Sequence, residues 1–229
     1  MKKRIEHIIQ MRNPEFKFDM HLSNRDLISF LFQQSIAFVR GLKFFICFRN
    51  PKFMLLGKRT EFINLHKIKF GKFLKIGSDV KIAAYGKQAI HLGNNVSIGD
   101  FSRLILCTTL NNLGEHITIG NNVGIGEFAY IGGAGGLTIS DDCIIGQYLS
   151  CHPENHDYSI LGKNIRFQGV QRLGIHIGKN CWIGSKVTIL DGVKIGDNCV
   201  IAAGAVVKDS FPENSVIAGV PAKLVKTRI

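Results

Sequence analysis

Several sequence signals are missing from this chain of 229 residues, and each absence narrows its class. None of the six cysteines forms a C-x-x-C pair, and the charged N-terminus has no long apolar stretch of the kind a cleavable signal peptide carries. We therefore expect a reduced cytoplasmic protein with buried thiols. The basic residues form no dense run, and helix-turn-helix, RNP and zinc-finger patterns are absent, so we expect no nucleic-acid partner.

A long uninterrupted apolar run is also lacking. The most hydrophobic stretch is LISFLFQQSIAFVRGLKFFICF at residues 27–48, and it is interrupted by Gln33, Gln34, Arg40 and Lys43. A bilayer-spanning helix needs about 20 predominantly apolar residues. The stretch instead predicts an amphipathic helix that packs on the body of the protein or lies on a membrane surface.

Acidic residues are scarce in the first third of the chain. Residues 1–75 contain 16 Lys and Arg against 5 Asp and Glu, whereas residues 76–229 contain 13 against 12. This asymmetry predicts a basic, apolar, partly helical segment at 1–70 joined to a near-neutral domain at 71–229. The basic segment suits an anionic glycan or the inner face of a membrane, and a simply solvated helix face explains it equally well.

What the sequence does contain is a six-residue period. Its clearest stretch reads IGKNCW-IGSKVT-ILDGVK-IGDNCV-IAAGAV over residues 177–206, with shorter matching units from residue 76 onward. The aliphatic residue of each unit is followed four positions later by a small or β-branched one, as in Ile177 and Cys181. An α-helix would need a period of 3.6, so the repeat predicts a mainly β fold, a parallel β-solenoid with these residues inside.

Three short motifs add to the repeat. They are NCWIG at 180–184, AAGAVV at 202–207 and VIAGVPAK at 216–223. With them, residues 70–229 resemble the hexapeptide-repeat acyltransferases, and most closely the O-acetyltransferases of sugars and bacterial surface polysaccharides. The resemblance implies a left-handed parallel β-helix with 18 residues per three-faced coil, so that Cys181 stacks on Cys199. It also implies a homotrimer that binds acetyl-CoA between neighbouring prisms, without a metal.

The period is lost between Ser150 and His176, where the sequence begins CHPENHDYS. An insertion between coils has to leave the solenoid, so we expect a protruding loop at about 150–176. Acyl transfer to a hydroxyl needs a base, and histidine suits this role because its pKa lies near neutrality. His156 is the predicted base, with His152 as the competing candidate. Both could instead be ordinary loop histidines.

Supporting roles are predicted for neighbouring residues. Asp157 or Glu154 would orient the imidazole, and Asn155 would bind the acceptor or turn the chain. Trp182, the only tryptophan, should project outward from its unit, and the resemblance places it near the thioester; packing against the loop or another subunit is the alternative.

Coenzyme A would need small residues at its closest approach and cations at its phosphates. Gly184, Ala202 and Ala203 fit the first requirement. Lys208, Lys223 and Lys226 fit the second, although any one of them alone is more typical of a solvated surface.

The resemblance therefore predicts an acetyl-CoA-dependent O-acetyltransferase that modifies a sugar hydroxyl of capsule, lipopolysaccharide or exopolysaccharide through a ternary complex. Amino-sugar N-acetylation and antibiotic O-acetylation remain alternatives, and so does a non-catalytic binding solenoid. A further alternative is a zinc enzyme like the β-helical carbonic anhydrases, in which His152 and His156 would be joined by His91, His116 or His176. No cysteine or serine lies in a nucleophile-and-base context, which disfavours an acyl-enzyme.

Overall fold

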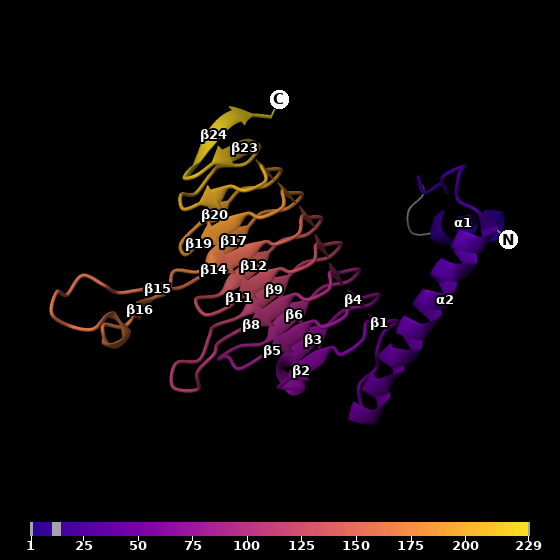
Figure 1. Cartoon of the computed structure of the whole chain (residues 1–229), viewed down its shortest axis with the longest axis horizontal. Helices are drawn as coiled ribbons and strands as arrows, with labels where there is room; N and C mark the ends of the chain where they lie inside the picture. The colour runs from indigo at the N-terminus through magenta and orange to yellow at the C-terminus, as the bar shows by residue number, and fades with distance from the viewer. Residues whose placement is uncertain (1, 11–14, 229) are drawn as a thin grey trace.

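The six-residue period produces three sheets of parallel strands, which form the faces of a solenoid and of which the first ends in the antiparallel hairpin of β23 and β24 (Figure 1). The computed structural model describes residues 2–10 and 15–228. The first face contains β1 (Leu55–Leu56), β4 (Lys75–Ile76), β7 (Ser97–Ile98), β10 (Gly124–Ile125), β13 (Ile144–Ile145), β18 (Trp182–Ile183), β21 (Val200–Ile201), β23 (Ser215–Gly219) and β24 (Ala222–Thr227).

The other two faces alternate with the first along the chain. The second face contains β2 (Glu61–Ile63), β5 (Lys81–Ala83), β8 (Arg103–Ile105), β11 (Tyr130–Gly132), β14 (Ser150–His152), β19 (Thr188–Leu190) and β22 (Val206–Val207). The third contains β3 (Ile68–Phe70), β6 (Ile90–Leu92), β9 (Ile117–Ile119), β12 (Leu137–Ile139), β17 (Ile175–Ile177) and β20 (Lys194–Ile195). The 3₁₀ turn η2 (Leu65–Lys67) joins β2 to β3.

The core of the solenoid is the interior column of aliphatic residues that the period predicts. Ile177, Ile183 and Ile189 are each 0% exposed, and the small residues between them are also buried. In the C-terminal coils, residues 18 apart pair across adjacent coils, as Trp182 does with Val200, whereas earlier coils are longer, as in the pairing of Leu55 with Lys75. The predicted parallel β-helix and the inward orientation of the repeat are therefore confirmed.

The solenoid begins earlier than the sequence boundary at residue 71. β1 pairs with β4 and β2 with β5, so the first coil starts at Leu55. Leu56, Phe62 and Ile68 keep the six-residue spacing, and Gly57 follows Leu56 as Gly93 follows Leu92 in a later unit. The signal of the first coil was therefore present in the sequence, but the boundary at residue 71 followed the change in charge and the first Ile-Gly unit at Ile76, and so missed it.

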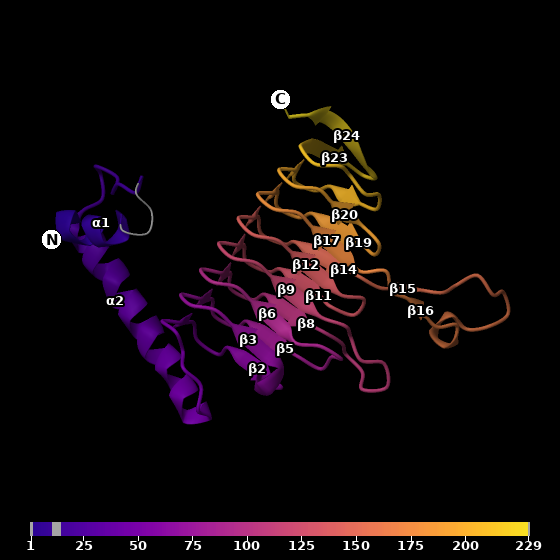
Figure 2. The same ribbon diagram turned by 180° about the vertical axis from the view of Figure 1, so that it is seen from behind.

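The N-terminal segment is largely helical. It contains α1 (Lys2–Gln10), α2 (Asn24–Gly41) and the 3₁₀ helix η1 (Leu42–Cys47). Ser23 and Asp26 form a reciprocal capping box at the start of α2. The end of α2 approaches β1 closely, since a Cβ on Gly41 would lie 2.2 Å from the Met54 carbonyl oxygen. The helix therefore joins the solenoid at its C-terminal end, and its N-terminal end lies apart from it (Figures 1 and 2).

The 3₁₀ helix η1 covers the open end of the solenoid core. The buried ring of Phe44 meets Phe62 edge-to-face at 5.1 Å and Phe70 at 5.4 Å between centroids. Repeat folds need such a cap because the first coil has no preceding coil to cover its apolar interior. The partly helical N-terminal segment predicted from the sequence thus contributes to the same core.

One corner of the solenoid carries a column of aromatic rings. Phe101, Phe128 and Tyr148 stack in parallel with centroid separations of 4.9 Å, and all three are partly exposed. They lie between the first and second faces at positions where φ is positive, which most side chains avoid. The stacking contacts of three successive coils offset part of that cost.

Two loops leave the solenoid at another corner, the one between the second and third faces. The larger one, residues 153–174, contains β15 (Asn155–His156), η3 (Ile165–Phe167) and β16 (Val170–Gln171), and it confirms the predicted protrusion (Figure 1). The smaller one spans residues 107–116 and was not predicted. Both interrupt the path from second face to third, so they emerge beside each other, two coils apart.

Candidate active site

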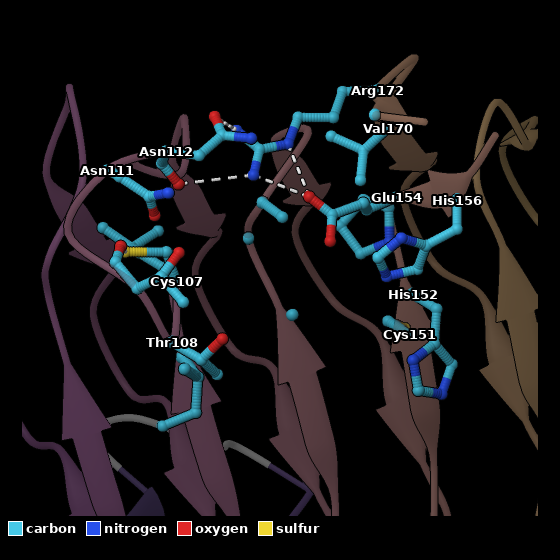
Figure 3. Close-up of a pocket in the computed structure, with 18 of the residues that line it drawn as sticks. Cys107, Thr108, Asn111, Asn112, Cys151, His152, Glu154, His156, Val170 and Arg172 are labelled. Atoms are coloured by element: carbon cyan, nitrogen blue, oxygen red, sulfur yellow. Dashed lines mark hydrogen bonds and ion pairs between the residues drawn. The ribbon is translucent and has the colours of Figure 1, made fainter. Parts of the chain in front are cut away.

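A cleft of about 920 Å³ lies between the two loops. The floor comes from the ends of β8, β11 and β14, with Gly132 and Gly133 among the lining residues. One wall carries His152, His156 and Glu154, and the other carries Cys107, Thr108 and Asn111 (Figure 3). The loop that the sequence singled out therefore forms one side of this cleft.

Arg172 joins the two walls at the top of the cleft (Figure 3). Its Nε donates to Glu154 Oε2 at 2.7 Å, and its Nη1 donates to Asn112 Oδ1 at 2.8 Å and to the Leu113 carbonyl at 2.9 Å. The Arg172 and Glu154 side chains are largely shielded from solvent. A planar guanidinium with several donors can hold both partners at once, so Arg172 fixes the width of the cleft.

Replacing Arg172 with methionine should loosen the larger loop. Chymotrypsin is then expected to cleave at Tyr158, Leu161 and Phe167 about tenfold faster, because local opening of the loop becomes easier once the bridge is lost. Arg59→Met, which breaks an exposed ion pair with Asp79 on the other side of the solenoid, is the control and should leave the rate unchanged. Equal cleavage rates for Arg172→Met and the unmodified chain would show that the bridge does not restrain the loop.

His152 is the better-oriented of the two histidines. It lies on β14, where His152 pairs with Leu190 of the next coil. Its Nε2 lies 2.7 Å from Ser150 Oγ, and its ring stacks on Tyr130 with a centroid separation of 5.5 Å. A hydrogen bond and a ring contact together restrict the imidazole to one orientation.

His156 lies on the loop itself. It pairs with Val170 in the two-stranded ribbon of β15 and β16, and its side chain is exposed at the cleft. The described residues include no hydrogen-bond partner for its imidazole. Asp157 belongs to the same ribbon, where its N–H donates to the Gly169 carbonyl, and Asn155 pairs with Gln171. Neither Asp157 nor Asn155 lines the cleft.

Burial and charge alter two groups in the cleft. Burial, with a smaller contribution from the negative charge of Glu154, raises the pKa of Tyr130. Burial raises the pKa of Cys151 to about 12. A thiol with that pKa has almost no thiolate at neutral pH, so Cys151 is a packing residue of the cleft floor and not a nucleophile.

The residues predicted to bind coenzyme A lie elsewhere on the chain. Trp182 is exposed on the first face, and Gly184, Ala202 and Ala203 stack at the corner between the first and second faces. Lys208 follows β22 and pairs with Asp209, while Lys223 lies on β24 in the final hairpin. Within one chain, none of these residues lines the cleft that contains the histidines.

The histidines proposed as alternative zinc ligands do not form a cluster. Along the third face, His91 pairs with Thr118, Thr118 with Thr138, and Thr138 with His176. His91 and His176 are thus separated by two coils whose matching residues are threonines. In residues 2–10 and 15–228, no group of three or more potential ligand side chains could hold a metal ion.

The smaller loop and Tyr130 are the parts of the site that sequence reasoning missed. A length signal was present, because paired residues 95 and 122 are 27 apart, whereas paired residues 122 and 142 of the next coil are 20 apart. The excess falls in the polar sequence TTLNNLGEH at 108–116. Counting residues between successive repeat units would have located this loop.

Comparison with known proteins gives the class of protein that the sequence predicts, the hexapeptide-repeat acyltransferases. The model of the bacterial transferase hexapeptide family matches residues 174–209. An Escherichia coli K12 protein that carries the name lipopolysaccharide biosynthesis O-acetyl transferase is 30% identical over 69% of this chain and 71% of its own length. The galactoside O-acetyltransferase of the same organism is 39% identical over 39% of this chain and 43% of its own length.

A solved structure shows the same fold. It is a mutant N-acyltransferase from Bacillus cereus in complex with dTDP and coenzyme A, 19% identical over 77% of this chain and 82% of that chain, with a TM-score of 0.50. From the repeat architecture and the match to the Escherichia coli K12 protein, the chain belongs to the hexapeptide-repeat acyltransferase family.

Proposed function

We propose that this protein transfers an acetyl group from acetyl-CoA to a sugar hydroxyl of a bacterial surface polysaccharide. The observation that carries the proposal is the cleft with two imidazoles on one wall, built on a hexapeptide-repeat solenoid. The names of the relatives support a sugar acceptor, since they include galactoside and lipopolysaccharide O-acetylation. The NCWIG and AGVPAK motifs support coenzyme A as the carrier of the acetyl group.

The reaction needs one proton to be moved. An imidazole removes the proton of the acceptor hydroxyl while its oxygen attacks the thioester carbonyl, and the imidazolium then returns that proton to the departing thiolate of CoA. Donor and acceptor are bound together in this scheme. The high pKa of Cys151 supports direct transfer, because this thiol, adjacent to His152 in the sequence, is not available as a covalent carrier.

The structure favours His152 over His156 as this base. A base on a paired strand is held more precisely than one on a loop ribbon. Ser150 and Tyr130 orient His152, whereas no described group orients His156. The sequence prediction of His156 is therefore retained as the second candidate, and His152 becomes the first.

A homotrimer would unite the two halves of the site. The cleft lies at one edge of the second face, and Lys208 follows β22 at the same edge, outside the lining of the cleft. Toward the other edge of this face, or on the first face, lie Trp182, Gly184, Ala202, Ala203 and Lys223. Exposed apolar side chains near that other edge, namely Phe128, Tyr148, Ile144 and Trp182, support burial against another copy of the chain. We propose that the donor lies along this contact.

The test is release of CoA from acetyl-CoA in the presence of candidate acceptors. The panel should contain capsule, lipopolysaccharide and exopolysaccharide fragments, free galactosides, an amino sugar and a hydroxylated antibiotic. Release that depends on a polysaccharide or sugar hydroxyl, with an O-acetyl ester in the product, is the expected result. An amide product would assign N-acetylation, and no acceptor-dependent release with any of them would contradict the proposal.

A further inference from the structure

The helical segment ends in an exposed apolar tip, defined as Phe45, Ile46 and Phe48. These side chains are 58%, 81% and 100% exposed, whereas Phe44 between them and α2 is buried in the core. The direction of Phe44 accounts for the exposure of its neighbours, because consecutive residues of a tight helix point to different sides. The tip therefore points away from the solenoid end that Phe44 covers.

The exposed side of α2 continues the apolar character of the tip. Ile28, Phe32 and Val39 are 56%, 66% and 64% exposed. Their spacings of four and seven residues place them on one side of the helix, and we call them the helix stripe. Only Leu27 and Gly41 of α2 are buried, so this is not the core helix of a globular domain.

The sequence around these apolar side chains carries charge of one sign. Between Asp26 and Glu61 the chain has no acidic residue and six basic ones: Arg40, Lys43, Arg49, Lys52, Lys58 and Arg59. Arg40 and Lys43 lie between the helix stripe and the tip in the sequence. A combination of exposed Phe and Ile with Lys and Arg is the composition of helices that lie in a membrane interface.

We propose that the tip and the helix stripe bind the surface of a bilayer that contains anionic lipid. The apolar side chains would enter the boundary between headgroups and acyl chains, and Arg40 and Lys43 would meet the lipid phosphates. Arg49 and Lys52 donate to backbone carbonyls of the solenoid and Arg59 pairs with Asp79. Arg40 and Lys43 are therefore the cations assigned to lipid. With no acidic residue between Asp26 and Glu61, this charge favours an anionic bilayer as the partner. The proposal does not depend on the acyl-transfer reaction.

The same segment meets the length and composition of a membrane span over Asn24–Cys47, with a mean hydropathy of 1.2. One such helix is weak evidence for spanning. Two observations favour a position in the interface. Gln33 and Gln34 would lie near the centre of the bilayer if the helix crossed it, at a cost for each unpaired amide. Phe44 anchors the C-terminal end to the water-soluble solenoid.

Flotation of the purified full chain with preformed vesicles tests the proposal. We expect binding to vesicles of phosphatidylcholine and phosphatidylglycerol at 7:3, and much weaker binding to phosphatidylcholine alone. The triple variant Phe45→Ser, Ile46→Ser, Phe48→Ser should reduce partitioning by about a hundredfold, since it removes the inserted apolar area. Arg40→Gln with Lys43→Gln should reduce it by about tenfold and lower its dependence on salt.

The control variant removes three exposed apolar side chains from other surfaces, by Leu161→Ser, Leu224→Ser and Val225→Ser. It should bind vesicles like the unmodified chain, and melting temperatures should confirm that all variants fold. Equal binding of the tip variant, or equal binding to vesicles without anionic lipid, would overturn the proposal. A tip variant that changes oligomeric mass in light scattering would assign the tip to another copy of the chain. Binding to preformed vesicles that resists alkaline carbonate would instead indicate a spanning helix.

Discussion

Replacing His152 with alanine is expected to lower kcat for acetyl transfer by about 10²–10⁴-fold, the usual contribution of a positioned general base. His156→Ala should lower it by no more than about tenfold. The difference follows from position: His152 is on a paired strand against Tyr130, and His156 is on a ribbon at the mouth of the cleft. Steady-state release of CoA at saturating acetyl-CoA and acceptor would measure both.

Ser150→Ala tests whether the orientation of the His152 imidazole matters for activity, because it removes the neighbouring hydroxyl and leaves the histidine in place. Because the Ser150 hydroxyl lies 2.7 Å from His152 Nε2, its removal should cost about tenfold in kcat while leaving KM for acetyl-CoA nearly unchanged. Thermal melting should show that all three variants remain folded. A large loss in His156→Ala with an active His152→Ala would return the base to the position that the sequence favoured. Full activity of both variants would rule out an imidazole base.

The fold was largely predictable because the solenoid is made of one repeated local rule. An inward aliphatic residue every six positions and turn residues between them specify the strand, its face and its neighbours together. The prediction was incomplete where that rule is weakest. The coil at Leu55–Phe70 has Gly57 and Asn64 but no Ile-Gly unit, and its basic residues grouped it with the N-terminal segment. The cap made by Phe44 depends on a contact that no period describes.

The site was predictable in place but not in detail. A gap in the repeat located the larger loop, and a histidine-rich sequence at its start indicated a base. The choice between His152 and His156 depends on Tyr130, which is 22 residues before His152 in the sequence and meets it only because β11 and β14 are adjacent. The bridge from Arg172 to Asn112 likewise joins residues 60 apart, and such contacts are visible only once the coils are stacked.

Replacing Asp191 is the second change for which we expect a large effect, a loss of stability. This residue lies where the larger loop returns to the solenoid. Asp191 is 8% exposed, and its carboxylate accepts hydrogen bonds from the N–H groups of Leu173 at 3.0 Å and Gly174 at 2.8 Å. Next to it, the Gly192 N–H donates to the Gly174 carbonyl at 2.8 Å. These contacts end the excursion and set the direction in which the chain enters β17.

Asp191→Ala leaves two backbone donors without their acceptor in a site that is largely shielded from water. Each lost hydrogen bond to a charged group costs about 1.5–3 kcal/mol, so the loss of two should lower the free energy of unfolding by about 3–6 kcal/mol. For a chain of this size, we expect a decrease in Tm of about 6–20 °C. Asp191→Asn, which keeps an acceptor oxygen but not the charge, should give about half of that decrease.

Asp209 provides a matched control because it lies 18 residues after Asp191, at the same corner one coil further on. It is exposed and pairs only with Lys208, so Asp209→Ala should change Tm by less than about 2 °C. Differential scanning calorimetry of the three variants would measure this, and hydrogen exchange should show the added mobility of Asp191→Ala confined to residues 153–174. An equal decrease in Tm for both alanine variants would mean that this corner is sensitive to charge in general. A larger decrease in Tm for Asp191→Ala than for Asp209→Ala would show that the buried carboxylate stabilises the point where residues 153–174 rejoin the solenoid.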